Sequence, residues 1–264
     1  MKDALNQVDV AFVIDTTGSM GGFIRAAQDQ LRAVLQALID EQAIDLRVGV
    51  VEFRDFPPQD TTFVTRHYPL THDFEQVQKT LGKLQAGGGG DAPEAVYSGL
   101  ADACSKLKWR PHSSRLMFLV GDAPPHAFKP WNGSDRDRVR GDGFAKGCPS
   151  GLDVASVTAK IEELGATLFA LCMYPQGLVM SAFSELAEMT GGRCVAAQVN
   201  VVIREVETLL KAELEHVELD RGVLAALTEN PEVEINVLAE SLDVSRLNVA
   251  AAMARLGKRR LIGP

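Results

Sequence analysis

Short runs of apolar residues alternate along the chain with longer stretches in which apolar residues recur at helical spacing. The first run, Val10 to Ile14, has no polar interruption and leads directly into an acid. Such a run is typical of a strand that is buried on both faces of a parallel sheet. Further strands are predicted over 46–53, 62–70, 116–120, 166–174 and 193–197, and the 62–70 strand is expected at an edge because its apolar and polar residues alternate.

Segments with apolar residues three and four positions apart separate these strands. They predict helices over 22–40, 73–84, 153–164, 181–190 and 201–214. Another helix is predicted to begin near Pro93 and to run to about Lys108, because proline suits the first turn of a helix. Thr71 or Asp73 is expected to cap the 73–84 helix. Strands that alternate with helices predict an α/β fold with a mostly parallel six-stranded sheet and helices on both faces.

The pattern changes near residue 215. Three short amphipathic segments follow, predicted as helices near 219–227, 236–242 and 245–256, and residues 261 and 262 are expected to begin a short strand. The second and third of these helices have the spacing of a helix-turn-helix, and the whole segment resembles a winged-helix domain. We therefore expect two domains, 1–214 and 215–264, with a long loop insertion over 124–152 in the first.

Composition limits the kind of protein this can be. The chain has 264 residues, of which 46% are hydrophobic and 23% charged, and its net charge is −8. An acidic protein is not attracted as a whole to nucleic acid or to an anionic membrane, although a local basic face is compatible with this charge. No apolar run approaches membrane-spanning length and no signal core opens the chain, so we expect a cytoplasmic protein with four reduced cysteines.

Acids and hydroxyls stand where the apolar runs stop. Asp15, Thr17 and Ser19 follow the first strand, Asp122 follows the fourth, and Asp91 follows four glycines. These side chains converge if the first and fourth strands are neighbours at a topological switch point. Three unpaired carboxylates would repel one another and raise their own pKa values, and a divalent cation removes that conflict. Because all the ligands are oxygens, we expect Mg²⁺, with Mn²⁺ or Ca²⁺ as alternatives.

The motifs DTTGS at Asp15 to Ser19, GGGGDAPEA around Asp91 and GDAPPH around Asp122 resemble the von Willebrand factor A domain. That family's metal-ion-dependent adhesion site combines DxSxS, a threonine from a second loop and an aspartate from a third. The forms seen here are most similar to the hemicentin-type and alpha-kinase-linked branch. The resemblance covers about residues 8–214 and implies a Rossmann-like sheet and divalent-metal-dependent protein binding, generally without catalysis.

Two positions depart from the family pattern. Thr17 keeps the hydroxyl of the serine it replaces, so the change should be harmless. Asp91 stands where many members have threonine and adds a negative charge beside the metal. A better neutralised cation attracts a partner's carboxylate less strongly. We therefore expect a site that either holds its metal more constitutively or prefers a neutral ligand oxygen.

Several nearby residues admit more than one interpretation. Glu94, His126 and Trp131 are candidate partner contacts. Glu94 is also suited to capping or ion pairing at a helix start, and His126 to hydrogen bonding near the metal or to an exposed loop position. Trp131 is better suited to anchoring its own loop, and a zinc site made from His126 and Cys148 has only two ligands in its favour. For Asp15 to Ser19 the alternative is a strand-end acid followed by a helix cap.

Three functions fit these features. We expect an adaptor that binds another protein at its metal site and a second protein or DNA through the C-terminal helices. One alternative is a DNA-binding regulator, with Arg246 and Asn248 facing the groove and phosphate contacts from Arg255, Lys258, Arg259 and Arg260. The other is a metal-dependent nuclease or phosphohydrolase. Acidic residues near the C-terminus offset the basic ones, which weakens the case for DNA binding. Two of the first-strand ligands are hydroxyls and no basic track is evident near the strand-end acids, so we expect no enzyme. We also expect no membrane partner.

Overall fold

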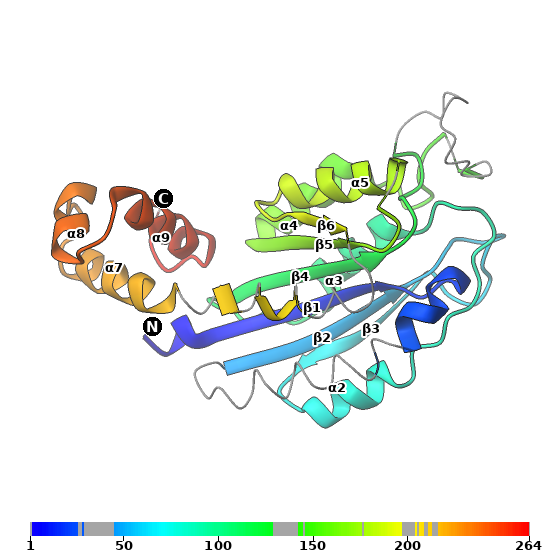
Figure 1. The fold of residues 1–264 in the computed structure, drawn as a ribbon, viewed down its shortest axis with the longest axis horizontal. Helices are drawn as coiled ribbons and strands as arrows, with labels where there is room; N and C mark the ends of the chain where they lie inside the picture. Colours follow the sequence, from blue (N-terminus) through cyan, green and yellow to red (C-terminus); the bar gives the residue numbers. More distant parts are fainter. Residues whose placement is uncertain are drawn as a thin grey trace.

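The computed structural model describes residues 2–25, 28, 45–128, 142–144, 146–175, 177–196, 204, 206–208, 211, 212 and 216–263. A six-stranded sheet runs through the molecule in the order β3-β2-β1-β4-β5-β6 (Figure 1). All neighbouring strands are parallel except β2 and β3, which are antiparallel. This confirms the predicted fold class. The strands are β1 (Gln7–Asp15), β2 (Asp45–Phe53), β3 (Thr65–Thr71), β4 (Ser114–Gly121), β5 (Ala166–Cys172) and β6 (Cys194–Ala196).

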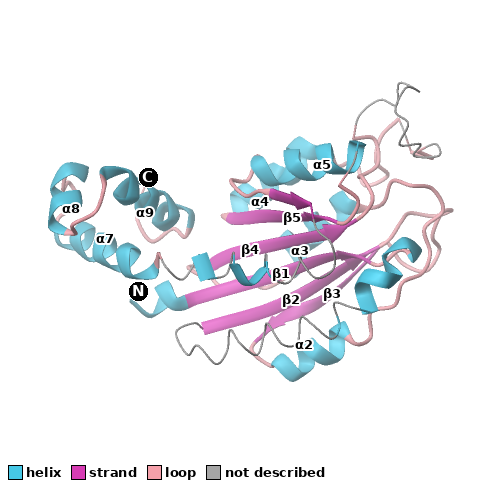
Figure 2. Cartoon of the chain, in the orientation of Figure 1, coloured by secondary structure: helices cyan, strands magenta, loops and turns pink. Residues whose placement is uncertain are grey.

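Two hydrophobic clusters bury the two faces of the sheet. Along β1, Val10 and Phe12 belong to one cluster, while Ala11 and Val13 belong to the other. This explains why the run has no polar interruption. Helix α2 (Phe74–Leu81) packs on the first face, and α3 (Val96–Lys106), α4 (Val154–Leu164) and α5 (Gly177–Glu188) supply residues to the second (Figure 2).

Some predicted boundaries are wrong for identifiable reasons. Helix α3 begins at Val96 and not at Pro93, because the preceding residues form an isolated bridge between Glu94 and Pro125. Of the two expected caps for α2, Asp73 is the one used, and its side chain accepts a hydrogen bond from the Gln76 amide. The helices predicted over 22–40 and 201–214 lie mostly outside the described residues.

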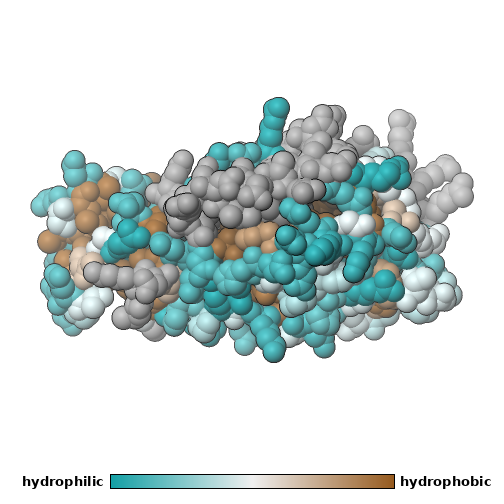
Figure 3. Space-filling view, turned by 90° about the horizontal axis from the view of Figure 1, so that it is seen from below, coloured by the Kyte–Doolittle hydropathy of each residue, from teal (hydrophilic) through white to brown (hydrophobic). Residues whose placement is uncertain are grey.

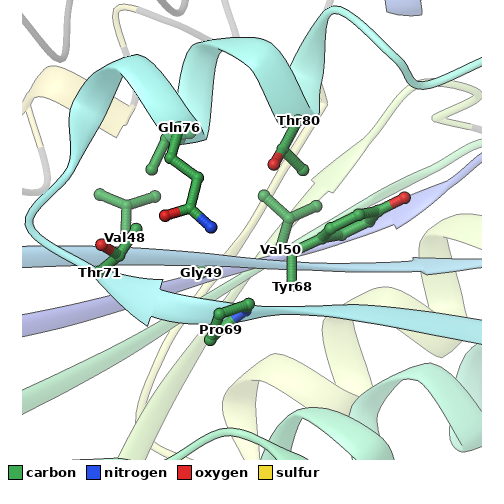
Figure 4. Close-up of a pocket in the computed structure, with 9 residues that line it drawn as sticks. Val48, Gly49, Val50, Tyr68, Pro69, Thr71, Gln76 and Thr80 are labelled. Atoms are coloured by element: carbon green, nitrogen blue, oxygen red, sulfur yellow. The ribbon is translucent and has the colours of Figure 1, made fainter.

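A small recess separates α2 from the outer strands, with room for little more than one water molecule at about 10 Å³. Val48 and Val50 point from β2 toward Gln76 and Thr80 of α2 (Figure 4). Between the two valines the register of β2 and β3 shifts at Gly49, where a side chain would come within 3.2 Å of the backbone of β3. The recess is a packing feature of this edge and lies on a different part of the sheet from the acids.

The C-terminal helices α7 (Val217–Glu229), α8 (Ile235–Ser241) and α9 (Arg246–Lys258) form a third hydrophobic cluster together with Leu5. Ser245 caps α9, as its hydroxyl accepts a hydrogen bond from the Asn248 amide at 3.1 Å. In the described part of the chain after residue 215 these helices are joined by turns without a strand, and the strand expected at 261 and 262 is a bend. None of the helices within the described ranges is long and apolar enough to cross a bilayer.

The C-terminal helices lie at the end of the sheet where the parallel strands begin (Figure 1). Arg259 donates hydrogen bonds to the carbonyl oxygens of His112 and Ala4. Lys258 and Arg260 also donate to groups of the sheet-bearing part, namely Thr167, Thr190 and Glu163. The opposite end of the sheet, where β1 and β4 finish, is therefore left clear of these helices.

A buried carboxylate fastens the end of the sheet where β1 begins. Asp9 has no exposed surface, and both of its oxygens accept hydrogen bonds from Arg47 and Arg110 at 2.8–3.0 Å. Burial acts to raise the pKa of Asp9, but these two arginines outweigh it and lower the pKa. The ionised form of Asp9 is therefore part of the folded structure.

Replacing Asp9 with Asn should destabilise the fold by about 3–5 kcal/mol, because it leaves the buried ends of Arg47 and Arg110 without their counter-charge. The matched control is Asp45→Asn, since Asp45 also pairs with Arg110 but is 42% exposed, and it should cost under about 1 kcal/mol. Urea unfolding of the two variants measures both values. Equal losses in the two variants would contradict this account of Asp9.

Candidate metal centre

The ends of β1 and β4 bring Asp15 and Asp122 together. The two strands are neighbours through the pair Ile14 and Val120, so their carboxyl ends meet at the topological switch point of the sheet. A Cβ at Gly121 would lie 3.2 Å from the Cβ of Asp15, so glycine eases the packing of the end of β4 beside Asp15. The predicted convergence of the first and fourth strands is confirmed.

A chain of hydrogen bonds joins the residues of the first loop to Asp122. Asp15 Oδ1 accepts from the amide and the hydroxyl of Thr17 at 2.8 and 2.7 Å. The hydroxyls of Thr17 and Ser19 are 3.4 Å apart, and that of Ser19 donates to Asp122 Oδ1 at 3.0 Å. The 3₁₀ helix at Gly18–Met20 has no side-chain cap, so these hydroxyls do not cap it.

The carboxylates at this edge are poorly solvated. Asp15 has no exposed surface, and its Oδ2 has no hydrogen-bond partner among the described residues. Burial and the nearby charge of Asp122 raise the pKa of Asp15 to about 7, and burial also raises the pKa of Asp122. A buried unpartnered oxygen beside a second acid is the environment that a divalent cation stabilises.

Glu94 lies inside this cluster and not at an exposed helix start. It is 4% exposed, and its Oε2 has no hydrogen-bond partner in the described structure. Burial and the charges of the surrounding aspartates raise the pKa of Glu94 to about 10. The cap of α3 is Ala95, which makes no side-chain hydrogen bond, so the capping interpretation of Glu94 is wrong.

Asp91 does not take part in the hydrogen-bond chain of the first loop. Its Oδ2 accepts from the Gly143 amide at 2.7 Å, and ligand atoms of Asp91, Asp55 and His126 lie within 4.8 Å of one another. Sequence reasoning missed Asp55. The signal for it is the one that identified Asp15 and Asp122, because Asp55 is an acid two residues beyond the end of β2.

His126 is completely buried, so its interpretation as an exposed loop residue is wrong. Its Nε2 is 2.6 Å from Asp55 Oδ1, and its Nδ1 is 2.8 Å from Asp142 Oδ1. Burial acts to lower the pKa of His126, but hydrogen bonds to these two acids outweigh it and raise the pKa. Cys148 instead lies near Ser150 and is not in the ligand group of His126.

The glycines at 87–90 let the backbone pass very close to neighbouring carboxylate side chains. Gly88 has a φ of 74°, and a Cβ at this position would fall inside the carboxylate of Asp60. Gly89 has a φ of 79°, and a Cβ there would come within 2.9 Å of Glu94. Arg54 holds the adjoining loops, since it donates to the Gln85 carbonyl at 2.7 Å and pairs with Asp60 at 3.6 Å.

The candidate nucleic-acid contacts lie at the other end of the molecule. Arg246 and Asn248 are exposed at the start of α9, whereas Arg255 pairs with Asp220 within the C-terminal helices at 2.5 Å. Lys258, Arg259 and Arg260 make the contacts with the sheet-bearing part described above. Trp131 lies outside the described residues.

Comparison with known proteins agrees with this geometry. Residues 9–133 match the von Willebrand factor A domain. The A-domain match covers β1 to β4 and includes Asp15, Asp91 and Asp122. Alpha-protein kinase vwkA of Dictyostelium discoideum is 26% identical over 163 residues, which are 61% of this chain and 24% of that protein.

Two solved structures share the fold. The pilus adhesin SpaC from Lactobacillus rhamnosus GG has a TM-score of 0.58 at 15% identity, covering 80% of this chain and 30% of that one. Proximal thread matrix protein 1 from the mussel byssus was solved with zinc in its MIDAS motif, the metal-ion-dependent adhesion site. It has a TM-score of 0.52 at 12% identity, and the match covers 80% of this chain and 47% of that one. The sheet thus has the Rossmann-like fold of A domains, and the chain spans less than half of each of these three proteins.

The raised pKa of Asp15 predicts the direction in which stability changes with pH. Because its folded pKa of about 7 exceeds its ordinary value of 3.8, the cation-free protein should lose stability as the pH rises from about 4 to about 7. Mg²⁺ binds the ionised form, so its stabilising effect should grow over the same range. Thermal unfolding with Mg²⁺ or with a chelator, at about pH 5 and about pH 8, measures both effects. The Asp15→Asn variant should show a weaker pH dependence, and an unchanged one would contradict the assignment.

Proposed function

We propose that this chain is a divalent-cation-dependent protein-binding module with an adaptor role. The cation is held by Asp15, Thr17, Ser19 and Asp122. The observation that carries the proposal is the buried Oδ2 of Asp15, which has no hydrogen-bond partner in the described ranges and lies beside a second acid at the carboxyl edge of the sheet. The A-domain match supports it, because proteins of this family often bind other proteins.

The position of Ser19 explains how a partner gains access to the cation. Asp15 and Thr17 are buried, whereas Ser19 is exposed and hydrogen-bonded to Asp122. A cation among these oxygens would therefore be bound on its protein-facing side by Asp15 and Thr17, and it would be open to solvent on the side of Ser19. A divalent ion such as Mg²⁺ normally keeps several waters, and a partner's oxygen can replace one of them.

The oxygen-only ligand set favours Mg²⁺, with Mn²⁺ or Ca²⁺ as alternatives. The zinc-occupied motif of the mussel byssus protein supports divalent cation binding at a site of this kind. The extra negative charge of Asp91 and Glu94 near the centre supports constitutive retention of the cation or a preference for a neutral partner oxygen. The motifs and the Dictyostelium relative support the hemicentin-type and alpha-kinase-linked branch.

We further propose that the C-terminal helices form a separate module that binds protein and not DNA. Hydrophobic surface gathers at their end of the molecule, where Ile235, Val237 and Leu247 are exposed (Figure 3). The side chains of five of the six candidates for nucleic-acid contact already bind groups of this chain, namely Arg246, Arg255, Lys258, Arg259 and Arg260. This supports protein binding over DNA binding at these helices. We also propose a cytoplasmic location, which fits the four free cysteines.

The proposal predicts that capture of a partner depends on the cation. In a pull-down from native lysate with the full chain as bait, a partner should be retained with Mg²⁺ and lost with a chelator, since the cation completes the contact. Asp15→Ala and Ser19→Ala should also lose it, and because Ser19 is exposed its replacement should disturb the fold less than that of the buried Asp15. Glu75→Ala, which removes an exposed acid of α2, is the control and should retain the partner. Partners that are indifferent to the chelator and to Ser19→Ala would contradict the proposal.

A further inference from the structure

We propose that the chain has a second cation site, separate from the centre at Asp15 and Asp122, in which Asp55, Asp91 and His126 bind a transition-metal dication such as Zn²⁺. Each of the three residues offers a ligand atom, and these atoms lie within 4.8 Å of one another. Asp55 follows β2, Asp91 follows the glycine run and His126 follows β4, so the fold itself brings the three together. This inference does not depend on the first centre holding a metal.

The two carboxylates each have one oxygen held and one oxygen free. Asp55 Oδ1 accepts from the Phe56 amide at 2.6 Å, and Asp91 Oδ2 accepts from the Gly143 amide at 2.7 Å. The other oxygens, Asp55 Oδ2 and Asp91 Oδ1, are buried and have no hydrogen-bond partner among the described residues. Asp55 as a whole has no exposed surface. Buried carboxylate oxygens without donors are costly unless a cation satisfies them.

The surroundings of His126 prepare its other nitrogen for a metal. Nδ1 lies 2.8 Å from Asp142 Oδ1, and that carboxylate is itself fixed by the amides of Ala127 and Phe144 at 2.7 Å. A histidine that donates Nδ1–H to a carboxylate presents the lone pair of Nε2, which is the arrangement common to histidine ligands of metals. The rings of Phe56 and Phe144 lie 5.8 and 5.0 Å from the imidazole and hold it in place.

The ligand chemistry separates this site from the first centre. One nitrogen and two carboxylates suit zinc and similar dications, and three protein ligands leave a coordination position open. The first centre offers only oxygens. Two ligands of one zinc ion lie roughly 3–3.5 Å apart, so the 2.6 Å approach of His126 Nε2 to Asp55 Oδ1 must open by less than about 1 Å when zinc replaces the bridging proton.

The competing interpretation is that His126 is a buried cation that ties Asp55 to Asp142. Both interpretations explain the two hydrogen bonds of His126. They differ at Asp91, because no hydrogen bond among the described residues joins Asp91 to His126, yet a carboxylate oxygen of Asp91 lies within 4.8 Å of the ligand atoms of Asp55 and His126. A zinc affinity that depends on Asp91 therefore distinguishes a metal site from an ion pair.

The test uses the full chain carrying Asp15→Asn and Asp122→Asn, which removes the first centre without changing side-chain shape. After treatment with a chelator and dialysis, this protein is titrated with Zn²⁺ by calorimetry and with Co²⁺ by visible absorption. It should bind one Zn²⁺ and give a Co²⁺ spectrum. Adding Asp91→Asn or His126→Gln should weaken zinc binding at least about tenfold and abolish that spectrum. Adding Glu75→Gln, the surface control, should change neither.

Three results would overturn the proposal: no zinc binding by the double variant, unchanged zinc binding when Asp91→Asn is added, or unchanged binding when His126→Gln is added. Circular dichroism and thermal unfolding establish that each variant is folded. If His126→Gln does not fold, Asp91→Asn still decides the matter, since Asp91 is only partly buried. Because the charge of Asp91 also lies near the first centre, the two sites are separated with His126→Gln in the otherwise unchanged chain, which should keep its Mg²⁺ binding. Failure of the second site and failure of the first are then distinguishable.

Discussion

The feature on which the rest of this structure depends is the crowding of carboxylates where β1 and β4 end side by side. Asp15 and Asp122 come from adjacent strands, and Glu94 lies close enough for both charges to raise its pKa. Carboxylates in a buried position repel one another and lose hydration, so the arrangement is stable only when protons or cations balance the charge. The loops around them are built to hold them there. Gly121 leaves room for Asp15, and Gly88 leaves room for the carboxylate of Asp60.

The division of the molecule into two ends follows from the sheet. Its interior is apolar on both faces, so polar groups collect where strands begin and where they finish. At the beginning, Asp9 is matched by Arg47 and Arg110, and the charges are balanced within the protein. At the other end, the described residues include four buried acids, and Arg54 is the buried arginine beside them. The acids are Asp15, Asp55, Asp60 and Glu94. Because its charges are balanced, the end beside the C-terminal helices has a structural role. The other end has an excess of acids and is therefore a candidate for binding cations.

Much of the fold could be predicted because it depends on local patterns. The unbroken run of Val10 to Ile14 identified a central strand, and the acids at strand ends identified Asp15 and Asp122. Predictions were wrong where a tertiary contact overrides the local signal. The bridge from Glu94 to Pro125 delays the start of α3. The close contact of His126 with Asp55 and Asp142 joins the loop after β2 to the loop after β4, which are far apart in sequence. Asp55 carried the same strand-end signal as Asp15, but its partners could be known only from the structure.

The central claim is that cations balance the acids at this edge of the sheet. The most direct measurement is the anomalous X-ray scattering of Mn²⁺ in crystals of the full chain. The account predicts an anomalous peak among Asp15, Ser19 and Asp122 that disappears in the Asp15→Asn protein. Ordered crystals that show no Mn²⁺ between Asp15 and Asp122, in a buffer at which both acids are ionised, would contradict it.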